Sequence, residues 1–409
     1  MVEKSTNPDF MIKCKSAFVG IVTKLFDITG KALSGEWGTD DPDGCGIPVL
    51  RTTNFTNVGK VNYDNVVTRN IQKKNISDKL LKKGDIIIEK SGGTDKNPVG
   101  RVIYFEGEEN KYLFNNFTGL LRVKDKNEWY PKYVFYSMFA YYKRGGTRRF
   151  ENKTTGLHNL KLDDYIKRLD IQKASYVDQV HVCKLLDCVR LQIDNMEREL
   201  ELLDELIKAR FVEMFGDPVT NDMLWNTDVL KDICTKIGSG STPRGGKESY
   251  IDEGISLIRS MNVHNAYFEY KDLAHITLDQ AEKLNNVVVE HDDLLFNITG
   301  ASVARCCVVL SDVLPARVNQ HVCILRCREK INPIFLQGLL VNENYQGKLL
   351  QIAKSGATRE AINKQQLESL EIMIPTLELQ NQFASFVEEI DKSRLLSNHS
   401  LFLTKSIIF

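Results

Sequence analysis

Residues 202–218 read LLDELIKARFVEMFGDP and close a long helical pattern near the middle of a 409-residue chain. Gly216 and Pro218 follow the last apolar residues and are typical of a helix stop. Upstream, Ser175 with Asp178 three residues later matches the capping box of a helix N-terminus. The pattern therefore predicts one helix of about 42 residues, which at roughly 1.5 Å per residue is about 60 Å long.

The apolar residues of this helix alternate in spacings of four and three, which is typical of a coiled-coil seam. The seam residues are Val182, Leu186, Val189, Ile193, Met196, Leu200, Leu203 and Ile207. A second such pattern begins near Thr376, with Phe383, Val387 and Ile390 on its seam. We expect the two helices, here called rods, to pack antiparallel and to hold flanking domains at opposite ends under a pseudo-twofold axis. The alternative is that the first rod docks onto its own domain.

The segments that precede the two rods repeat one another. IPVLRTTN at 47–54 matches ISLIRSMN at 255–262, and KKGDIIIEKSGG at 82–93 matches EHDDLLFNITGA at 290–301. Farther on, Asn115 aligns with Asn319, and Gln179 aligns with Gln380. The matches keep one order while their offset drifts slowly, so they indicate a duplication.

Each copy reads as short β-branched runs, then an amphipathic helix that opens with Pro at 131–143 or 333–350, then a Gly-containing loop and a long rod. The expected fold class is α+β, with two tandem α/β domains separated by two long antiparallel coiled-coil helices in an internal repeat. The predicted boundaries are 1–174 and 218–375 for the domains, and 175–217 and 376–409 for the rods.

The stretch from Ala209 to Pro218 occurs only once, because the offset of 201 pairs Phe409 with Lys208. We therefore interpret it as the junction between the two copies. Phe211, Met214 and Phe215 are expected to pack the end of the first rod against the second domain, and a docking patch for a partner subunit is the alternative.

The net charge is zero overall but unevenly distributed. Residues 1–174 contain 30 Lys and Arg against 21 Asp and Glu, whereas residues 175–217 contain 5 against 10 and residues 218–375 contain 16 against 19. A basic first domain is compatible with a polyanionic partner, and the nearly balanced second domain would need its basic residues on one face to play the same role.

Several classes of protein are disfavoured by the sequence. No apolar run approaches the roughly 18 residues that cross a bilayer, and the N-terminus lacks a signal-peptide pattern. The nine cysteines contain no CxxC pair, so we expect reduced thiols and a cytoplasmic protein. No spaced ligand set for a metal is present. GSGSTPRGGKE at 238–248 has the wrong spacing for a phosphate loop, and no catalytic motif stands out. A duplicated module with no catalytic motif in either copy is more plausibly a binding module than an enzyme.

The loops of both copies hold side chains suited to DNA, because Arg pairs well with guanine and Asn with adenine, while Lys, Ser and Thr reach phosphates. In the first copy the candidates are Arg51, Asn54, Lys90, Ser91, Lys96, Arg101, Asn115, Arg144, Arg148, Arg149, Lys153, Thr154 and Thr155. In the second copy they are Arg259, Asn262, Asn297, Thr299, Arg305, Asn319, Gln320, Lys354, Ser355, Thr358 and Arg359. The alternative for any single residue is a solvated turn, and Asn54 and Asn262 are alternatively turn caps.

The domain–rod order, GEWGTDDPDGCGIPVLRTTN, the ARFVEMFGDP end of the first rod and LEIMIPTLELQNQF before the second resemble the DNA specificity subunit of type I restriction-modification systems. The resemblance spans essentially the whole chain. It implies two target-recognition domains, each reading one half of a split DNA target, with the rods as a spacer. Two departures from the family pattern are the early end of the second rod and the entries Asp178-Gln179 and Leu379-Gln380, where the family has Glu-Gln.

The resemblance also implies a non-catalytic chain that binds double-stranded DNA in the cytoplasm, associated with the nucleoid, and holds no cofactor itself. Two modification subunits would dock on it and methylate adenine with S-adenosylmethionine, and restriction subunits would add cleavage driven by ATP and Mg. A different class remains open, namely a bivalent protein-binding scaffold for which DNA binding is incidental.

Overall fold

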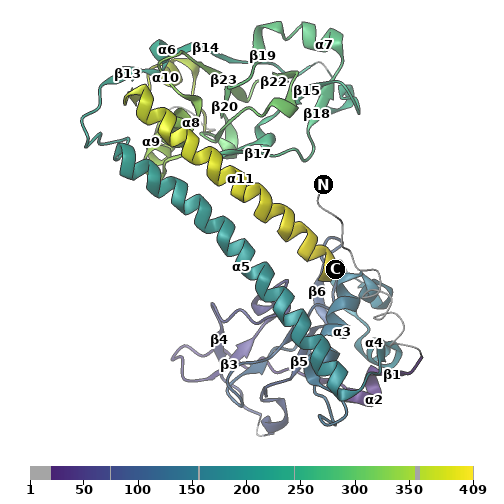
Figure 1. Ribbon diagram of the computed structural model, residues 1–409. Coiled ribbons are helices and arrows are strands. Elements are labelled where there is room, and N and C mark those ends of the chain that lie inside the picture. Colours follow the sequence, from purple (N-terminus) through teal and green to yellow (C-terminus); the bar gives the residue numbers. More distant parts are fainter. Residues whose placement is uncertain (1–19, 74, 155–156, 244, 355–359, 409) are drawn as a thin grey trace. The chain divides into compact units, whose positions relative to one another are not determined.

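The structure is a computed structural model that describes residues 20–73, 75–154, 157–243, 245–354 and 360–408. It is α+β and divides into two compact units, one ending at Asp194 and including the last residues from Phe402, the other comprising Asn195–Leu401. The first rod, helix α5 (Tyr176–Phe215), continues through this division. Each unit therefore contains one α/β module and part of the rods, and each is described below by itself (Figure 1).

The first module runs from β1 to β12 and contains a four-stranded sheet of order β2–β9–β5–β7, three-stranded sheets β4–β3–β8 and β10–β11–β6, and the pair β1–β12. Its strands are β1 (Val22–Lys24), β2 (Leu33–Ser34), β3 (Ile47–Leu50), β4 (Val67–Arg69), β5 (Ile86–Glu89), β6 (Ser91–Gly93), β7 (Val102–Tyr104), β8 (Leu113–Phe114), β9 (Thr118–Leu121), β10 (Glu151–Thr154), β11 (Leu157–Leu160) and β12 (Asp170–Gln172). Its helices are α2 (Leu25–Thr29), α3 (Pro131–Lys143) and α4 (Leu162–Arg168).

Helix α3 has the bounds predicted from the sequence and opens with Pro131, whose missing N–H needs no partner at a helix start. Its buried residues Val134, Met138 and Phe139 join Ile86, Val102 and other strand residues in one apolar core. The amphipathic pattern of this segment is therefore the pattern of a helix that covers a sheet.

The second module runs from β13 to β24 and contains four-stranded sheets of order β14–β23–β20–β21 and β18–β15–β22–β19, with pairs β13–β24 and β16–β17. Its strands are β13 (Thr227–Val229), β14 (Cys234–Ser239), β15 (Ile255–Ile258), β16 (Val263–His264), β17 (Tyr267–Phe268), β18 (Ala274–Ile276), β19 (Val288–Val289), β20 (Leu294–Asn297), β21 (Cys306–Val308), β22 (Ala316–Val318), β23 (Val322–Cys327) and β24 (Glu371–Met373). Its helices are α6 (Leu230–Ile233), α7 (Leu278–Glu282), α8 (Pro333–Val341), α9 (Glu343–Lys354) and α10 (Lys364–Glu368).

The duplication predicted from the sequence is confirmed by strand register. Leu121 lies opposite Ile86 in the first module, and Leu325 lies opposite Leu294 in the second. The N–H of Asn115 donates to Leu50, and that of Asn319 donates to Ile258. The same sequence pairing thus corresponds to the same position in each sheet.

A buried carboxylate–arginine pair recurs at one place in the two modules. Asp85 accepts bonds of 2.7 Å from both Nε and Nη2 of Arg122. Asp293 accepts bonds of 2.7 and 2.9 Å from the same atoms of Arg326. Each aspartate raises the pKa of its arginine through these charge-assisted hydrogen bonds.

A buried glutamine fixes the start of each rod. Gln179 accepts from the N–H of Tyr130 at 2.8 Å and donates to the carbonyls of Glu128 and Ala174. Gln380, in the second rod α11 (Leu377–Ile408), accepts from the N–H of Asn332 at 2.8 Å and donates to Lys330 and Pro375. Both side chains are fully buried. The glutamine of the rod entry therefore ties each rod to the loop before the Pro-initiated helix of its own module.

The seam predicted for α5 is the less exposed face of this helix. All eight seam residues are half-buried, whereas leucines between them, such as Leu185 and Leu202, are exposed. Val182 and Leu186 pack against the core of the first module, so the own-domain alternative holds at this end of the rod. Arg190 continues that contact by lying over the Phe139 ring.

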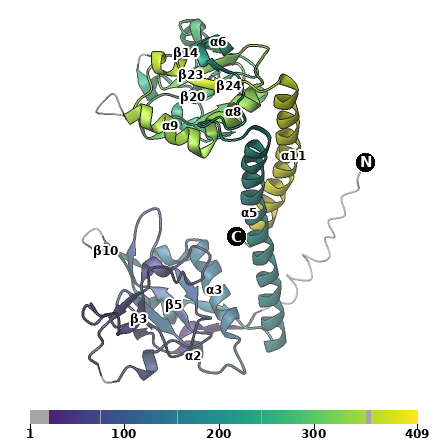
Figure 2. The same cartoon turned by 90° about the vertical axis from the view of Figure 1, so that its left-hand side faces the viewer.

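In the second unit the end of α5 pairs with α11, and the two helices lie side by side in both views (Figure 2). Glu199 contacts Ser397, Asp204 pairs with Arg394, and the Phe211 ring meets the Phe383 ring. In these pairs the residue number increases along α5 while it decreases along α11, so the expected antiparallel pairing is confirmed here. The rods and the other described helices include none that is long and apolar enough to cross a membrane.

The junction at the end of α5 packs as expected. Phe211 and Phe215 are buried, and their rings lie 5.9 and 4.8 Å from that of Phe335 in α8. Met214 packs against the same core. Gly216 ends the helix with a positive φ of 73°, a conformation that favours glycine. This apolar patch is filled by the second module, so it is not free to dock a partner.

One expected helix is two helices. The segment 333–350 was predicted to be a single helix, but α8 ends at Val341 and α9 begins at Glu343. Asn342 between them has an extended ψ of 138°, and its Oδ1 accepts from the N–H of Asn344 at 3.0 Å. The apolar periodicity continues through the break, so the pattern does not reveal it. The break arises because the Asn342 side chain caps the start of the second helix.

Candidate nucleic-acid interface

Two loops that are distant in sequence form one surface in the first module. The loop after β5 contains Lys90 and Lys96, and the loop after α3 contains the run from Arg144 to Arg149. The N–H of Leu160 donates to the carbonyl of Lys90 at 2.8 Å, which joins β11 to this surface. The guanidinium of Arg148 also donates to the carbonyl of Asp95 at 3.0 Å. The two basic loops predicted separately from the sequence are therefore neighbours.

The second module joins the corresponding loops in the same way. The N–H of Ile362 donates to the carbonyl of Ile298 at 2.9 Å, at the positions that match Leu160 and Lys90. The N–H of Gly300 donates to the carbonyl of Glu360, and Thr299 bridges to Ala361. A paired loop surface is thus a repeated feature of the fold and is here called the loop pair.

The basic residues of the first loop pair are mostly exposed. Lys96, Arg144, Arg148 and Arg149 are exposed, with Arg149 lying over the Phe150 ring at 4.9 Å. Lys90 is half-buried and donates to Ser34 Oγ at 3.1 Å, and burial together with Lys79 lowers the pKa of its ammonium. Ser91 is half-buried beside it. These side chains remain predicted DNA contacts.

Some predicted contacts fall where the structure makes no statement. Thr155, Ser355, Thr358 and Arg359 lie outside the described residues, as do the side chains of Lys153 and Thr154. In the second loop pair Lys354 and Gln320 are exposed, and Thr299 and Arg305 are half-buried. These four also remain predicted DNA contacts.

The structure contradicts a base-reading role for Asn54 and Asn262. Asn54 Oδ1 accepts from the N–H of Arg51 at 2.9 Å, and its Nδ2 donates to the carbonyls of Asn62 and Asp64. Asn262 makes the corresponding bonds with Arg259, Glu269 and Lys271. Both side chains are buried in the turns η1 (Thr52–Asn54) and η5 (Ser260–Asn262). They are the turn caps of the alternative interpretation.

The arginines before these turns are partly engaged in the same way. Arg51 Nη2 donates to the carbonyl of Asn65 at 2.9 Å, and Arg259 donates to the carbonyl of Asp272. Each arginine therefore closes the loop after its turn with one end of the guanidinium. Both are half-buried. Both arginines remain predicted DNA contacts.

Asn115 and Asn319 are also buried rather than presented to a ligand. Asn319 Oδ1 accepts from the N–H of His321 at 3.0 Å and shapes the turn before β23. Asn115 occupies the matching turn, where the N–H of Thr118 donates to its carbonyl at 3.1 Å. The expectation that these amides read bases is wrong, because both side chains are buried and cannot reach a base edge.

Arg101 and Asn297 are committed to closing the turns. In the first module Arg101 Nη1 and Nη2 donate to the carbonyls of Phe55 and Thr52 at 3.0 and 2.9 Å. In the second module Asn297 Nδ2 donates to the matching carbonyls, Ser260 at 2.9 Å and Val263 at 3.3 Å. Both were predicted to contact DNA, and both are corrected here, because their donors are used inside the fold.

A hollow of about 490 Å³ lies on the second loop pair, between η5, residues 299–302, Arg305 and His321. Arg305 Nη1 lies 3.3 Å from His264 Nδ1, and the His264 ring stacks on Tyr267. Thr299 Oγ1 lies 2.6 Å from His321 Nδ1. His264, Tyr267 and His321 were not among the predicted DNA contacts. The sequence contains no signal for this cluster, since its members come from separate loops.

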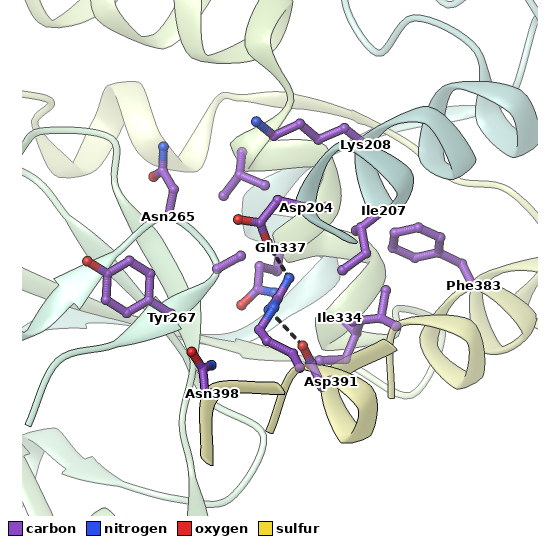
Figure 3. A pocket seen from close by; sticks show the side chains of 15 residues that line it. Asp204, Ile207, Lys208, Asn265, Tyr267, Ile334, Gln337, Phe383, Asp391 and Asn398 are labelled. Carbon is purple, nitrogen blue, oxygen red and sulfur yellow. Dashed lines mark hydrogen bonds and ion pairs between the residues drawn. The ribbon is translucent and has the colours of Figure 1, made fainter. Parts of the chain in front are cut away.

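A second hollow of about 430 Å³ separates the rods from the second module within the second unit (Figure 3). Ile207, Ile334 and Phe383 form its apolar wall. Arg394 bridges Asp204 of α5 and Asp391 of α11, and burial raises the pKa of the Asp391 carboxyl. The arrangement crosslinks the rods and offers no catalytic group.

The described cysteines are all free thiols. Burial raises the pKa of Cys307 and of Cys323 to about 12, so neither thiol is reactive at neutral pH. Among the described residues no group of three or more His, Cys, Asp or Glu side chains is placed to hold a metal ion.

Comparison with known proteins agrees with this architecture. Residues 223–401 match the family model of the type I restriction modification DNA specificity domain. The MjaX specificity subunit of Methanocaldococcus jannaschii, named for a type I restriction enzyme, is 22% identical over 391 residues, covering 90% of this chain and 86% of its own.

Solved structures share the fold. The S subunit of a type I restriction-modification system from M. genitalium aligns with a TM-score of 0.57 and 13% identity, over 100% of this chain and 96% of its own. A chain from a structure of complex assembly and conformational transition in a type I R-M system aligns with a TM-score of 0.57 and 14% identity, over 95% of each chain.

Two α/β modules with matched loop pairs, each tied to a long helix, define a duplicated binding protein. Residues 223–401 match the DNA specificity domain of type I restriction modification, and the chain is similar to specificity subunits of such systems over nearly its whole length.

Proposed function

We propose that this chain is the subunit that selects the DNA target of a type I restriction-modification complex, with each module reading one half of a split sequence. The observation that carries the proposal is the loop pair, closed by the same backbone bond in both modules. A surface that is repeated while its side chains differ suits two readers of unlike sequences. Exposed Lys96, Arg144 and Arg149 supply phosphate contacts in the first.

The rods act in this proposal as spacer and scaffold. A helix of 40 residues is about 60 Å long at roughly 1.5 Å per residue, whereas one turn of B-DNA measures roughly 34 Å. Such a helix suits half-sites separated by bases that neither module reads. Its exposed charged faces are available to partner subunits. The buried glutamine at each rod entry supports a fixed angle between a rod and its own module.

The chemistry belongs to partner subunits in this proposal. Two modification subunits would dock on the chain and methylate adenine with S-adenosylmethionine, and restriction subunits would use ATP and Mg to translocate and cleave DNA. This chain would contribute no catalytic residue and bind no cofactor, and the complex would act on DNA in the cytoplasm. Its role would be to decide where the others act.

A module exchange tests the proposal. Residues 218–375 are replaced by the corresponding domain of another family member, and the methylated sequence is determined by methylome sequencing of cells with and without each chain. One half of the methylated sequence should change while the other half is retained. The reciprocal exchange of residues 20–174 is the control and should change the other half. Methylation that does not depend on the chain, or a change in both halves from one exchange, would contradict independent reading.

A further inference from the structure

The hollow on the second loop pair has an arginine that the fold leaves available. In the first module the matching arginine, Arg101, closes the turn η1 through two carbonyls. In the second module Asn297 closes the turn η5 instead. Arg305 is thereby released from this task, and among the described residues its guanidinium bonds only to His264 Nδ1, at 3.3 Å.

The contact with His264 orients Arg305 and uses only one of its N–H donors. An arginine has five N–H donors and no acceptor, so His264 Nδ1 must be the acceptor of this bond and the imidazole is neutral in this arrangement. The His264 ring is held in turn by stacking on Tyr267, with centroids 4.6 Å apart. Arg305 is therefore positioned at the hollow, and its other donors have no partner among the described residues.

A second donor faces the same hollow. The Thr242 hydroxyl donates to Gln320 Oε1, and Gln320 Nε2 lies 3.1 Å from His321 Nε2. Because an amide nitrogen only donates, His321 Nε2 accepts, and the ring proton lies on Nδ1. That proton is donated to Thr299 Oγ1 at 2.6 Å. The hydroxyl proton of Thr299 is thus left for a ligand.

The first module lacks this arrangement at the matching positions. Phe117 corresponds to His321, because the N–H of Lys90 donates to Phe117 and that of Ile298 donates to His321. A phenyl ring cannot hold the hydroxyl of a neighbouring residue as the imidazole does. Ser91 matches Thr299 but has Phe117 where the second module has His321, and Arg101 is committed to the turn, so the first module does not repeat this pair of oriented donors.

We propose that Arg305 and the Thr299 hydroxyl bind an acceptor-only group of the DNA, which is either the O6/N7 edge of a guanine or a phosphate oxygen, and that only the second module does so. This inference rests on the proposed function. Two donors suit guanine, whose major-groove edge presents two acceptors, O6 and N7. Phosphate offers the same acceptor chemistry, so the experiment must separate the two.

The test uses the full chain and a duplex with the sequence that is methylated only in cells containing this chain. Arg305→Gln is compared with Arg328→Gln as a control. Arg328 is exposed and follows the C-terminal end of β23, so its replacement removes the same charge away from the hollow. We expect Arg305→Gln to weaken binding about tenfold to a hundredfold, and Arg328→Gln to change it by less than about threefold. Thr299→Ala should weaken binding, and Thr299→Ser should restore it because the hydroxyl returns. Circular dichroism melting confirms folding of each variant.

Modified duplexes then identify the acceptor. If it is guanine, replacing one guanine of the second half-site by 7-deazaguanine weakens binding of the wild-type chain but not of Arg305→Gln. If it is phosphate, Arg305→Gln weakens binding to cognate and unrelated duplexes equally and lowers the salt slope by about one. Equal binding by Arg305→Gln and Arg328→Gln overturns the inference while leaving the proposed function intact. A wild-type chain that prefers no sequence overturns the proposed function itself.

Discussion

The two modules agree at their buried charge pairs and differ where β5 and β20 end. Asp85 with Arg122 and Asp293 with Arg326 have nearly identical geometry. At the ends of the strands, however, the first module has Glu89 and the second has Asn297. That single difference decides which side chain closes the neighbouring turn. A duplicated fold thus preserves the bonds that hold the sheet while reassigning the donors at its surface.

The reassignment follows from charge. Glu89 is buried and offers only acceptors when ionised, so it pairs with Arg101 across 3.5 Å, and Arg101 also satisfies the turn carbonyls. Asn297 has donors of its own and reaches the carbonyls directly. The module with the buried charge therefore commits its arginine to the fold, whereas the module with the neutral amide keeps its arginine for the surface.

The largest expected difference between the modules lies at the junction where α5 ends. Phe211→Ala removes a buried ring that packs against Phe215, Phe335 and Phe383. We expect the free energy of unfolding of the second module to fall by about 3–5 kcal/mol, with little change in the first. Hydrogen exchange resolved by peptide measures each module separately. The exposed neighbour Val212→Ala is the control and should cost less than about 0.5 kcal/mol. Equal loss in both modules would show that the junction is not specific to the second.

The two charge pairs test whether equivalent positions of the repeat also contribute equally to the stability of their modules. Asp85→Asn leaves the half-buried Arg122 guanidinium without its counter-ion, whereas after Asp293→Asn the Arg326 guanidinium keeps the exposed Glu290 as a partner. We expect Asp85→Asn to destabilise the first module by about 3 kcal/mol, because breaking a buried pair strands the remaining charge, and Asp293→Asn to destabilise the second module somewhat less. Denaturant unfolding combined with hydrogen exchange measures both. Glu108→Gln, which breaks an exposed pair with Lys111, should leave the free energy of unfolding nearly unchanged. If the losses in free energy of unfolding differed several-fold between the modules, the two charge pairs would be equivalent in geometry but not in stability.

The smallest expected effect is a pH dependence confined to the first module. Burial raises the pKa of the Glu89 carboxyl, against the opposing effect of Arg101. A raised folded-state pKa contributes stability below the unfolded value of about 4.3, and that contribution is lost as pH rises through the folded pKa. The free energy of unfolding of the wild type minus that of Glu89→Gln should therefore fall as the pH rises from the unfolded-state pKa of Glu89 to its raised folded-state pKa. Denaturant unfolding at a series of pH values measures it. A constant difference, or one that rises with pH, would contradict the assigned cause.

Much of the architecture could be predicted from local pattern. The duplication, the bounds of α3, the seam of α5 and the packing of Phe211 and Phe215 follow from apolar spacing and helix-stop residues, which act within a few residues of each other. The break between α8 and α9 could not be predicted in this way. There the periodicity is continuous, and only the extended conformation and side-chain cap of Asn342 end the first helix.

The candidate site could be predicted only in part. Residue type marked the two basic loops, which stay a prediction, but it could not show that Asn54 and Asn262 are buried caps or that Arg101 is committed to a turn. The same types occur in turns and in DNA contacts, and the difference is burial.

The sequence by itself determined that there are two copies, where each rod lies and which loops are basic, because periodicity, charge and repeat offsets are properties of the chain. Only the tertiary structure decided which donors remain free. Thr242, His264 and His321 come from three separate loops, and their hydrogen bonds set the direction in which Thr299 and Arg305 can donate. Donor direction depends on atoms brought together by folding, and no local pattern records it.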